Sequence, residues 1–204
     1  MTNKIDFKLL PKDIEDITLE QSCKYMEIVG RDDIDDVAKT QRIIKLFTGM
    51  TNTQVVDMPM NDYEAAYSVI SKALNADVEF KNRFTLDGVE YGFVPNLDVI
   101  SAGEYIDLSG YGMSAENMHK VMAVLFRPII ESDNAGYYKI EPYRVDKERQ
   151  LLMKQAPMNI VNGMLVFFCL LSKELQVSTR RYMEENLGEA RKKLALTLRN
   201  GDGM

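Results

Sequence analysis

Few side chains in this sequence are of the types that carry nucleophilic or acid–base chemistry, and they are far apart. His119 is the single histidine, and Cys23 and Cys169 are the two cysteines. No second histidine can share a metal with His119, no neighbour makes it a general base, and the two thiols match no zinc or redox spacing. We therefore interpret His119 as structural and both cysteines as free, buried thiols. We assign no catalytic residue, no metal and no cofactor.

One acidic run resembles a calcium loop at first sight. Residues 31–36 read Arg-Asp-Asp-Ile-Asp-Asp. An EF-hand loop needs Gly at its sixth position and Glu at its twelfth, but counting from Asp32 these positions hold Val37 and Ile43. Carboxylates are favourable at the positive end of a helix dipole. The run therefore predicts the start of a helix and not a metal site.

Two further features could belong to a reaction or ligand site. Glu104 and Asp107 lie one turn apart on an expected helix, but acid–base work would require one of them to be buried with a raised pKa. We interpret the pair as a solvated helix face. Gly110-Tyr-Gly112 lacks the third glycine of a dinucleotide loop, and no phosphate-binding loop occurs elsewhere. The sequence therefore favours a protein that is not an enzyme.

The overall composition indicates a folded, soluble chain. The 204 residues are 46% hydrophobic and 27% charged, with a net charge of −6. This acidic balance argues against nucleic-acid binding through bulk electrostatics. The start of the chain has no apolar stretch typical of a signal peptide, and the longest apolar run, 164–171, is short of the roughly 20 residues that span a bilayer. We expect a cytoplasmic protein with no membrane and no direct nucleic-acid contact.

The centre of the chain predicts a small antiparallel sheet. Asp87-Gly88 separates two alternating runs within residues 80–94, which is a strong signal for a β-hairpin with a type I′ turn. Tyr137–Ile140 is expected to add a strand, and the alternation in Ile5–Leu9 suggests another.

Helices are expected to make up most of the remaining chain. Capping patterns predict helix starts at Thr18 and Ser101, and we expect Gly30 to end the first of these helices in the left-handed conformation. Another helix is expected over Asn117–Phe126, closed by Pro128. The sequence therefore predicts an α+β fold: a mainly helical domain, the small antiparallel sheet with its hairpin at 80–94, and a long C-terminal helical region.

The C-terminal region changes character along its length. The segment 158–175 is apolar nearly all round, as in a core helix, whereas the chain from Gln176 is polar. We therefore predict a domain over 1–175 and an extension over 176–204, with a break at Leu187-Gly188. A candidate partner-binding stripe falls on the helically spaced residues Met183, Leu187, Leu194 and Leu198. The extension is expected either to dock on a partner as an arm or to lie on its own domain as a last helix.

Six whole segments carry a similarity that spans most of residues 15–175. They are 16–21 (DITLEQ), 44–50 (IKLFTGM), 84–97 (FTLDGVEYGFVPNL), 103–108 (GEYIDL), 119–128 (HKVMAVLFRP) and 158–169 (MNIVNGMLVFFC). Together they resemble a family of small tailed-bacteriophage proteins, whose members serve as tail-assembly chaperones or as tail and neck components.

The resemblance implies a non-enzymatic phage morphogenesis protein that acts by protein–protein contact. A chaperone of tail assembly would shield an aggregation-prone partner in the host cytoplasm and then leave. The alternative is a ring or connector component that stays in the tail or neck of the virion. In either case the implied partners are other phage structural proteins and further copies of this chain. A remote alternative is an enzyme or small-molecule-binding domain, which would need convergent polar groups in a pocket.

Overall fold

The computed structural model describes the backbone of residues 5–200 and the side chains of residues 5–183. The chain divides into two compact units, Met1–Gly163 and Met164–Met204. The first unit combines helices with an antiparallel sheet and the second is helical, so the fold is α+β, as predicted.

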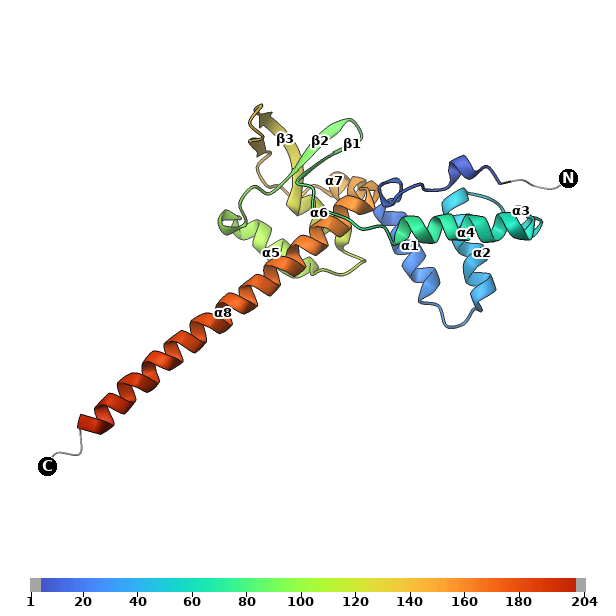
Figure 1. Ribbon diagram of the computed structural model, residues 1–204. Coiled ribbons are helices and arrows are strands. Elements are labelled where there is room, and N and C mark those ends of the chain that lie inside the picture. Colours follow the sequence, from blue (N-terminus) through green and yellow to red (C-terminus); the bar gives the residue numbers. More distant parts are fainter. Residues whose placement is uncertain (1–4, 201–204) are drawn as a thin grey trace. The chain divides into compact units, whose positions relative to one another are not determined.

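The first four α-helices gather at one end of the first unit (Figure 1). They are α1 (Leu19–Val29), α2 (Asp36–Thr48), α3 (Asn52–Val56) and α4 (Met60–Leu74). Thr18 caps α1 through the predicted capping box, and Asp35, from the acidic run, caps α2 by accepting a hydrogen bond from Ala38 N. The prediction that Gly30 is left-handed is wrong. Its φ of −72° and ψ of −1° lie in the right-handed helical region, so α1 ends without a residue in the left-handed conformation.

The predicted strand over Ile5–Leu9 is also wrong. Phe7–Leu9 form a 3₁₀ turn because the Asp6 side chain accepts a hydrogen bond from Lys8 N, 3.0 Å away. Asp residues often bond the backbone two positions on, and this local bond competes with pairing in a sheet. Phe7 and Leu9 are exposed, whereas Leu10 is buried. A second 3₁₀ turn, Ile14–Asp16, leads to Thr18.

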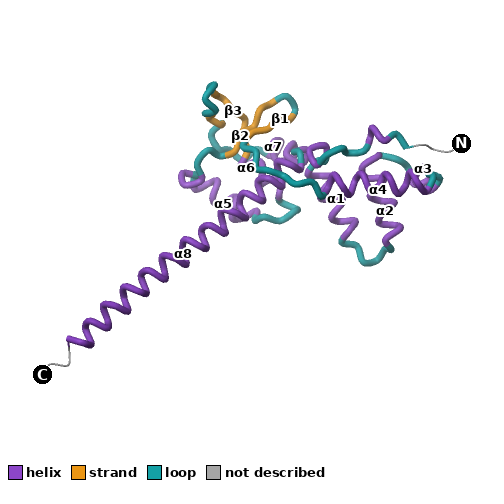
Figure 2. Tube along the Cα trace, viewed as in Figure 1, coloured by secondary structure: helices purple, strands orange, loops and turns teal. Residues whose placement is uncertain are grey.

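One four-stranded antiparallel sheet is present among the described residues, in the order β1-β2-β3-β4 (Figure 2). Its strands are β1 (Arg83–Leu86), β2 (Val89–Phe93), β3 (Phe126–Ser132) and β4 (Tyr138–Ile140). The hairpin is confirmed, because Asp87 and Gly88 both have positive φ, at 50° and 74°. Facing aromatic rings on this sheet, including Phe84, Phe93 and Phe126, pack with centroids 5.2 Å apart.

The helix predicted over Asn117–Phe126 is confirmed to within one residue at each end, but strand β3, which follows it directly, was not predicted. The helix α6 covers Met118–Leu125, and the chain enters β3 at Phe126 without a loop. Pro128, expected to close a helix, instead lies opposite Tyr91 in the sheet, and its carbonyl accepts a hydrogen bond from Glu141 N, 3.0 Å away. Residues 118–127 are all buried except His119 and Lys120. Fully buried helices and strands are both continuously apolar, so hydrophobic periodicity cannot locate this boundary.

The remaining helices alternate with the strands or follow them along the chain. They are the 3₁₀ turn Leu97–Val99, α5 (Ala102–Tyr111), α7 (Lys147–Leu152), the 3₁₀ turn Met153–Gln155 and α8 (Met158–Asn200). The beginning of α8 is fixed beside the beginning of α1: Met158 N donates to Ile17 O at 2.8 Å, and Leu19 N donates to Ala156 O at 2.9 Å.

Helix α8 is continuous over its 43 residues. The break predicted at Leu187-Gly188 is therefore wrong, and the domain boundary predicted at residue 175 falls inside this helix. A glycine inside a helix costs only about 1 kcal/mol relative to alanine, which the surrounding helix-forming residues offset. The glycine alone was therefore a weak signal for a break.

The hairpin turn provides a simple stability test. Replacing Gly88 with alanine is expected to lower the free energy of unfolding by about 1 kcal/mol, because a side chain disfavours the left-handed conformation. Nothing lies within 4 Å of the added carbon, so the effect comes from the backbone alone. Urea unfolding of Gly88→Ala measures it, and Gly88→Asn is the control, because Asn tolerates this conformation and should lose less. Equal losses in the two variants would contradict this explanation.

Candidate functional site

An apolar groove lies between α2, α3 and α4. Its volume is about 350 Å³. Val55 and Met58 form a buried floor. Val37, Val56 and Met60 also line the groove, but 63–64% of each side chain's surface is exposed. Three large apolar side chains around one hollow form the kind of patch that marks a contact surface.

The edges of this groove are held by polar contacts and carry acidic groups. Tyr63 Oη donates to Val37 O at 3.3 Å, which joins α4 to α2 beside the groove. Asp36 lines the groove, and Asp35 and Asp57 are exposed next to residues that line it. Lys39 is the basic residue one turn further along α2. The surroundings are therefore apolar at the centre and mainly acidic at the edge.

The described part of the second unit exposes apolar side chains on α8. Val166, Leu170 and Val177 are exposed by 42%, 56% and 54%, and their spacing of four and seven residues places them on one helix face. Leu175 and Met183 are also exposed, at other positions around the helix. Isolated exposed apolar residues are ordinary, but an aligned row is typical of a helix that packs against something.

The segment Met158–Met183 of α8 is also long and apolar enough, by length and composition alone, to cross a bilayer. Core helices of soluble proteins pass the same test, but only 22% of the apolar window is buried here, so the expectation of a core helix over 158–175 holds only for the beginning of α8, where Ile160 and Val161 are buried. This feature is therefore weak evidence for a membrane span.

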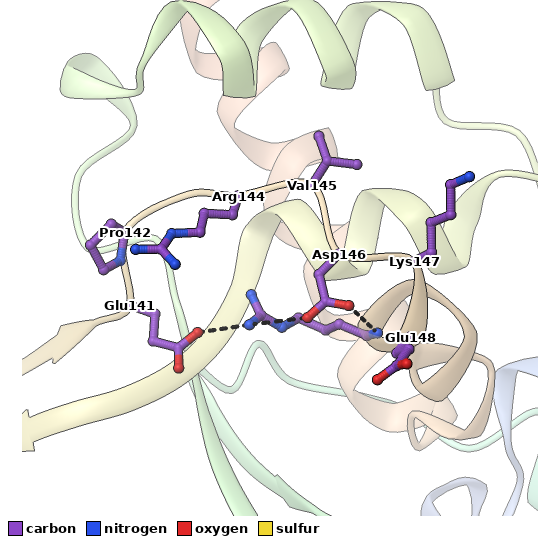
Figure 3. A pocket seen from close by; sticks show the side chains of 8 residues that line it. Glu141, Pro142, Arg144, Val145, Asp146, Lys147 and Glu148 are labelled. Carbon is purple, nitrogen blue, oxygen red and sulfur yellow. Dashed lines mark hydrogen bonds and ion pairs between the residues drawn. The ribbon is translucent and has the colours of Figure 1, made fainter.

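A polar cleft of about 580 Å³ is formed by the single segment 141–149 (Figure 3). Arg149 reaches back along this segment, with Nη2 2.7 Å from Glu141 Oε2 and 3.6 Å from Asp146 Oδ2. Its Nη1 atom is buried without a hydrogen-bond partner among the described residues. The cations and carboxylates of the segment are balanced, and these contacts fold the segment onto itself.

A buried ion pair connects α5 to β3. Arg127 Nη2 lies 2.7 Å from Glu104 Oε1, and the two residues are only 6% and 5% exposed. Glu104 Oε2 also accepts a hydrogen bond from Ser101 N at 2.6 Å, which completes the predicted capping box. Burial lowers the pKa of Arg127, and the Glu104 carboxylate opposes that shift. Because Glu104 is buried, our interpretation of Glu104 and Asp107 as a solvated face is wrong for Glu104.

Asp107 has a different partner. Tyr143 Oη donates a hydrogen bond to its carboxylate, and burial together with this bond raises the pKa of Tyr143 well above its usual range. The phenol therefore stays protonated at neutral pH. The two carboxylates have separate structural partners, and sequence spacing alone gave no sign that the side chains of Arg127 and Tyr143 would reach them.

The structure brings Cys23 and His119 to one hollow of about 270 Å³, which the sequence did not predict. A nucleophilic cysteine needs a lowered pKa. Here burial raises the pKa of the Cys23 thiol, which donates to Ala115 O at 3.6 Å. Burial, followed by Lys154 and Lys120, lowers the pKa of His119. Both shifts favour the neutral thiol and the neutral imidazole, which is the opposite of an activated thiolate–imidazolium pair.

Two other sequence predictions concern thiols and metals. Both cysteines are free, but Cys169 is exposed and Cys23 is only half-buried, so the prediction of two buried thiols is wrong. The apolar sequence around Cys169 led to that error. Among the residues that the structure describes, no group of three or more His, Cys, Asp or Glu side chains is placed to hold a metal ion.

The predicted partner-binding stripe is only partly covered by the structure. Met183 is exposed on α8. Leu187, Leu194 and Leu198 lie in the helical backbone, but their side chains are outside the described residues.

Comparisons of this chain with protein-family models, with curated protein sequences and with solved structures found no match.

Proposed function

We propose that this chain is a non-enzymatic bacteriophage morphogenesis protein that acts through protein–protein contacts in tail or virion assembly, in the manner of a tail-assembly chaperone. The proposal combines the resemblance of its segments to phage tail proteins with one structural observation. That observation is the row of exposed apolar residues Val166, Leu170 and Val177 on α8. It supports a surface that is completed by another protein chain.

The apolar side chains of this row are exposed to water. Burying apolar surface contributes roughly 25 cal/mol per Å², so a helix face of several Val and Leu residues gains stability when a partner covers it. Association also costs translational and side-chain entropy, and only the surplus appears as affinity. The row extends over three helical turns, so it contributes one continuous part of the apolar surface that a partner would cover.

A ring or connector component of the virion is the second candidate. It is favoured by a specific observation: the first unit carries an apolar groove with an acidic edge, which is a separate surface from the apolar row on α8. Two different surfaces on one chain suit a repeating heterologous contact between copies, which closes into a ring or grows into an open chain.

Charging the apolar row tests the proposal. The double variant Leu170→Lys/Val177→Lys is expected to lose self-association or partner binding, with at least a tenfold weakening, because each lysine must be desolvated at the contact. Light-scattering mass of the purified protein and co-purification with phage tail proteins measure this. Gln176→Lys, an exposed residue away from the row, is the control and should behave as the original chain. Equal behaviour of the double variant and the control would contradict the proposed use of α8.

Mass spectrometry of purified virions separates the two candidates. A fixed copy number in the particle, with a ring-sized oligomer in solution, supports the structural component. Absence from the particle, with a complex to a tail protein during infection, supports the chaperone. A monomer that retains no phage protein and is absent from virions would overturn both.

A further inference from the structure

We infer that the groove of α2, α3 and α4 is the docking site for the C-terminal segment, residues 187–200, of a second copy of this chain. The inference rests on the proposed function and deepens it, because it names both surfaces of one contact between copies.

The groove has the form that an amphipathic helix recognises. Its floor, at Val55 and Met58, is buried, and the exposed side chains of Val37, Val56 and Met60 surround it. A helix that binds in a groove uses anchors spaced by three, four or seven residues along one face. The occupant must therefore bring a short row of large apolar residues at that spacing.

The C-terminal segment has this spacing in its sequence. Leu187, Leu194 and Leu198 are seven and four residues apart, and the backbone is helical throughout this range. Positions with this spacing share one face of a helix. The segment therefore has the helical backbone and the apolar spacing that a groove of this kind accepts.

The charges of the two surfaces are complementary. The groove is bordered by Asp35, Asp36 and Asp57. The C-terminal segment carries four cations against the single carboxylate of Glu189; the cations are Arg191, Lys192, Lys193 and Arg199. Opposite charges around an apolar centre fix the register of a docked helix and raise its rate of association. In a chain whose net charge is −6, a concentrated basic segment is an unusual feature, and the acidic edge of the groove accounts for it.

The continuity of α8 favours a second copy as the source of this segment. A break at Leu187-Gly188 would have provided a hinge at which the segment could fold back. The backbone instead stays helical through Asn200, so residues 187–200 have no hinge of their own at which to turn back. Because the groove and the segment are different surfaces, the contact is heterologous.

A complementation experiment with full-length chains tests the inference. Val56→Glu damages the groove and Leu194→Glu damages the segment. Each variant alone is expected to weaken self-association by about tenfold or more, because a carboxylate at the apolar centre of the contact must lose its hydration when the helix docks. Mixed together, the two variants should form a one-to-one dimer, because the intact groove of one chain meets the intact segment of the other. Light-scattering mass before and after mixing measures this.

The matched control is Val99→Glu. Val99 is 74% exposed and does not line the groove, so this variant should associate as the original chain does. Thermal unfolding of Val56→Glu and Val99→Glu should be nearly unchanged, because the two substituted valines are exposed. Raising the NaCl concentration should weaken the contact, because the charges at its edge are screened.

Three results would contradict this inference. If the original chain self-associates but the mixture of the two damaged variants stays monomeric, the groove–segment contact is wrong while the proposed function stands. If Leu170→Lys/Val177→Lys loses self-association but Val56→Glu does not, the groove–segment contact is likewise wrong and the proposed function stands. A disulfide cross-link provides the last test, in a chain that carries Val56→Cys and Leu194→Cys and has its native cysteines replaced by serine. If this cross-link forms within single chains at every dilution, the segment does not come from a second copy.

Discussion

Replacing Arg127 with methionine is expected to lower the free energy of unfolding by about 3–5 kcal/mol, the range for breaking a buried ion pair from one side. The substitution keeps most of the side-chain volume, so the loss comes mainly from charge and hydrogen bonding. The carboxylate of Glu104, 5% exposed, would remain in the interior without its partner 2.7 Å away. Urea unfolding followed by circular dichroism measures the change.

Two controls isolate the effect of leaving the Glu104 carboxylate buried without its partner. In Arg127→Met/Glu104→Gln the buried charge is gone, and the amide can still accept the hydrogen bond from Ser101 N. We expect this double variant to be more stable than Arg127→Met alone. Lys139→Met removes one partner of an exposed pair with Glu131, at 3.3 Å, and should change stability by less than about 1 kcal/mol. Equal effects of Arg127→Met and Lys139→Met would show that burial of the first pair does not matter.

The helix-capping role of Glu104 could be predicted from the sequence, but its ion pair with Arg127 could not. Local signals located Glu104 correctly at the third position of a capping box, because a hydroxyl followed by Glu is a pattern within four residues. Its burial depends on Arg127, a residue 23 positions away whose strand was not predicted. Helix starts at Thr18 and Ser101 and the turn at Asp87-Gly88 were predictable for the same reason: their physical causes are local.

The groove could not be predicted because its parts come from three helices. Val37, Val56 and Met60 each fit an ordinary amphipathic helix, and their common exposure around one hollow arises only when α2, α3 and α4 pack together. The C-terminal stripe was visible in sequence because it lies on one helix. The hollow shared by Cys23 and His119 could not be predicted, because these residues lie on two different helices, α1 and α6.

Replacing Gly163 with alanine is expected to destabilise the protein by about 2 kcal/mol, although alanine is the better helix former. A Cβ at this position would lie 2.6 Å from Glu79 O and 3.1 Å from Phe80 Cα. Both atoms belong to the backbone segment that leads into the sheet, so no side-chain rotation relieves the contact. Either α8 or this segment must move, and the cost of that movement exceeds the roughly 1 kcal/mol gained from helix propensity.

Gly110 supplies the matched comparison, because it also lies in a helix, α5, but an added Cβ there meets nothing within 4 Å. Gly110→Ala should therefore raise the free energy of unfolding by up to about 1 kcal/mol, so the same chemical change is expected to have opposite signs at the two positions. Thermal and urea unfolding of both variants measure the difference. Stabilisation by both substitutions would mean that the close approach of α8 to residues 79 and 80 is not required. Destabilisation by Gly163→Ala alone would identify that contact as the reason for a glycine in the apolar first half of α8.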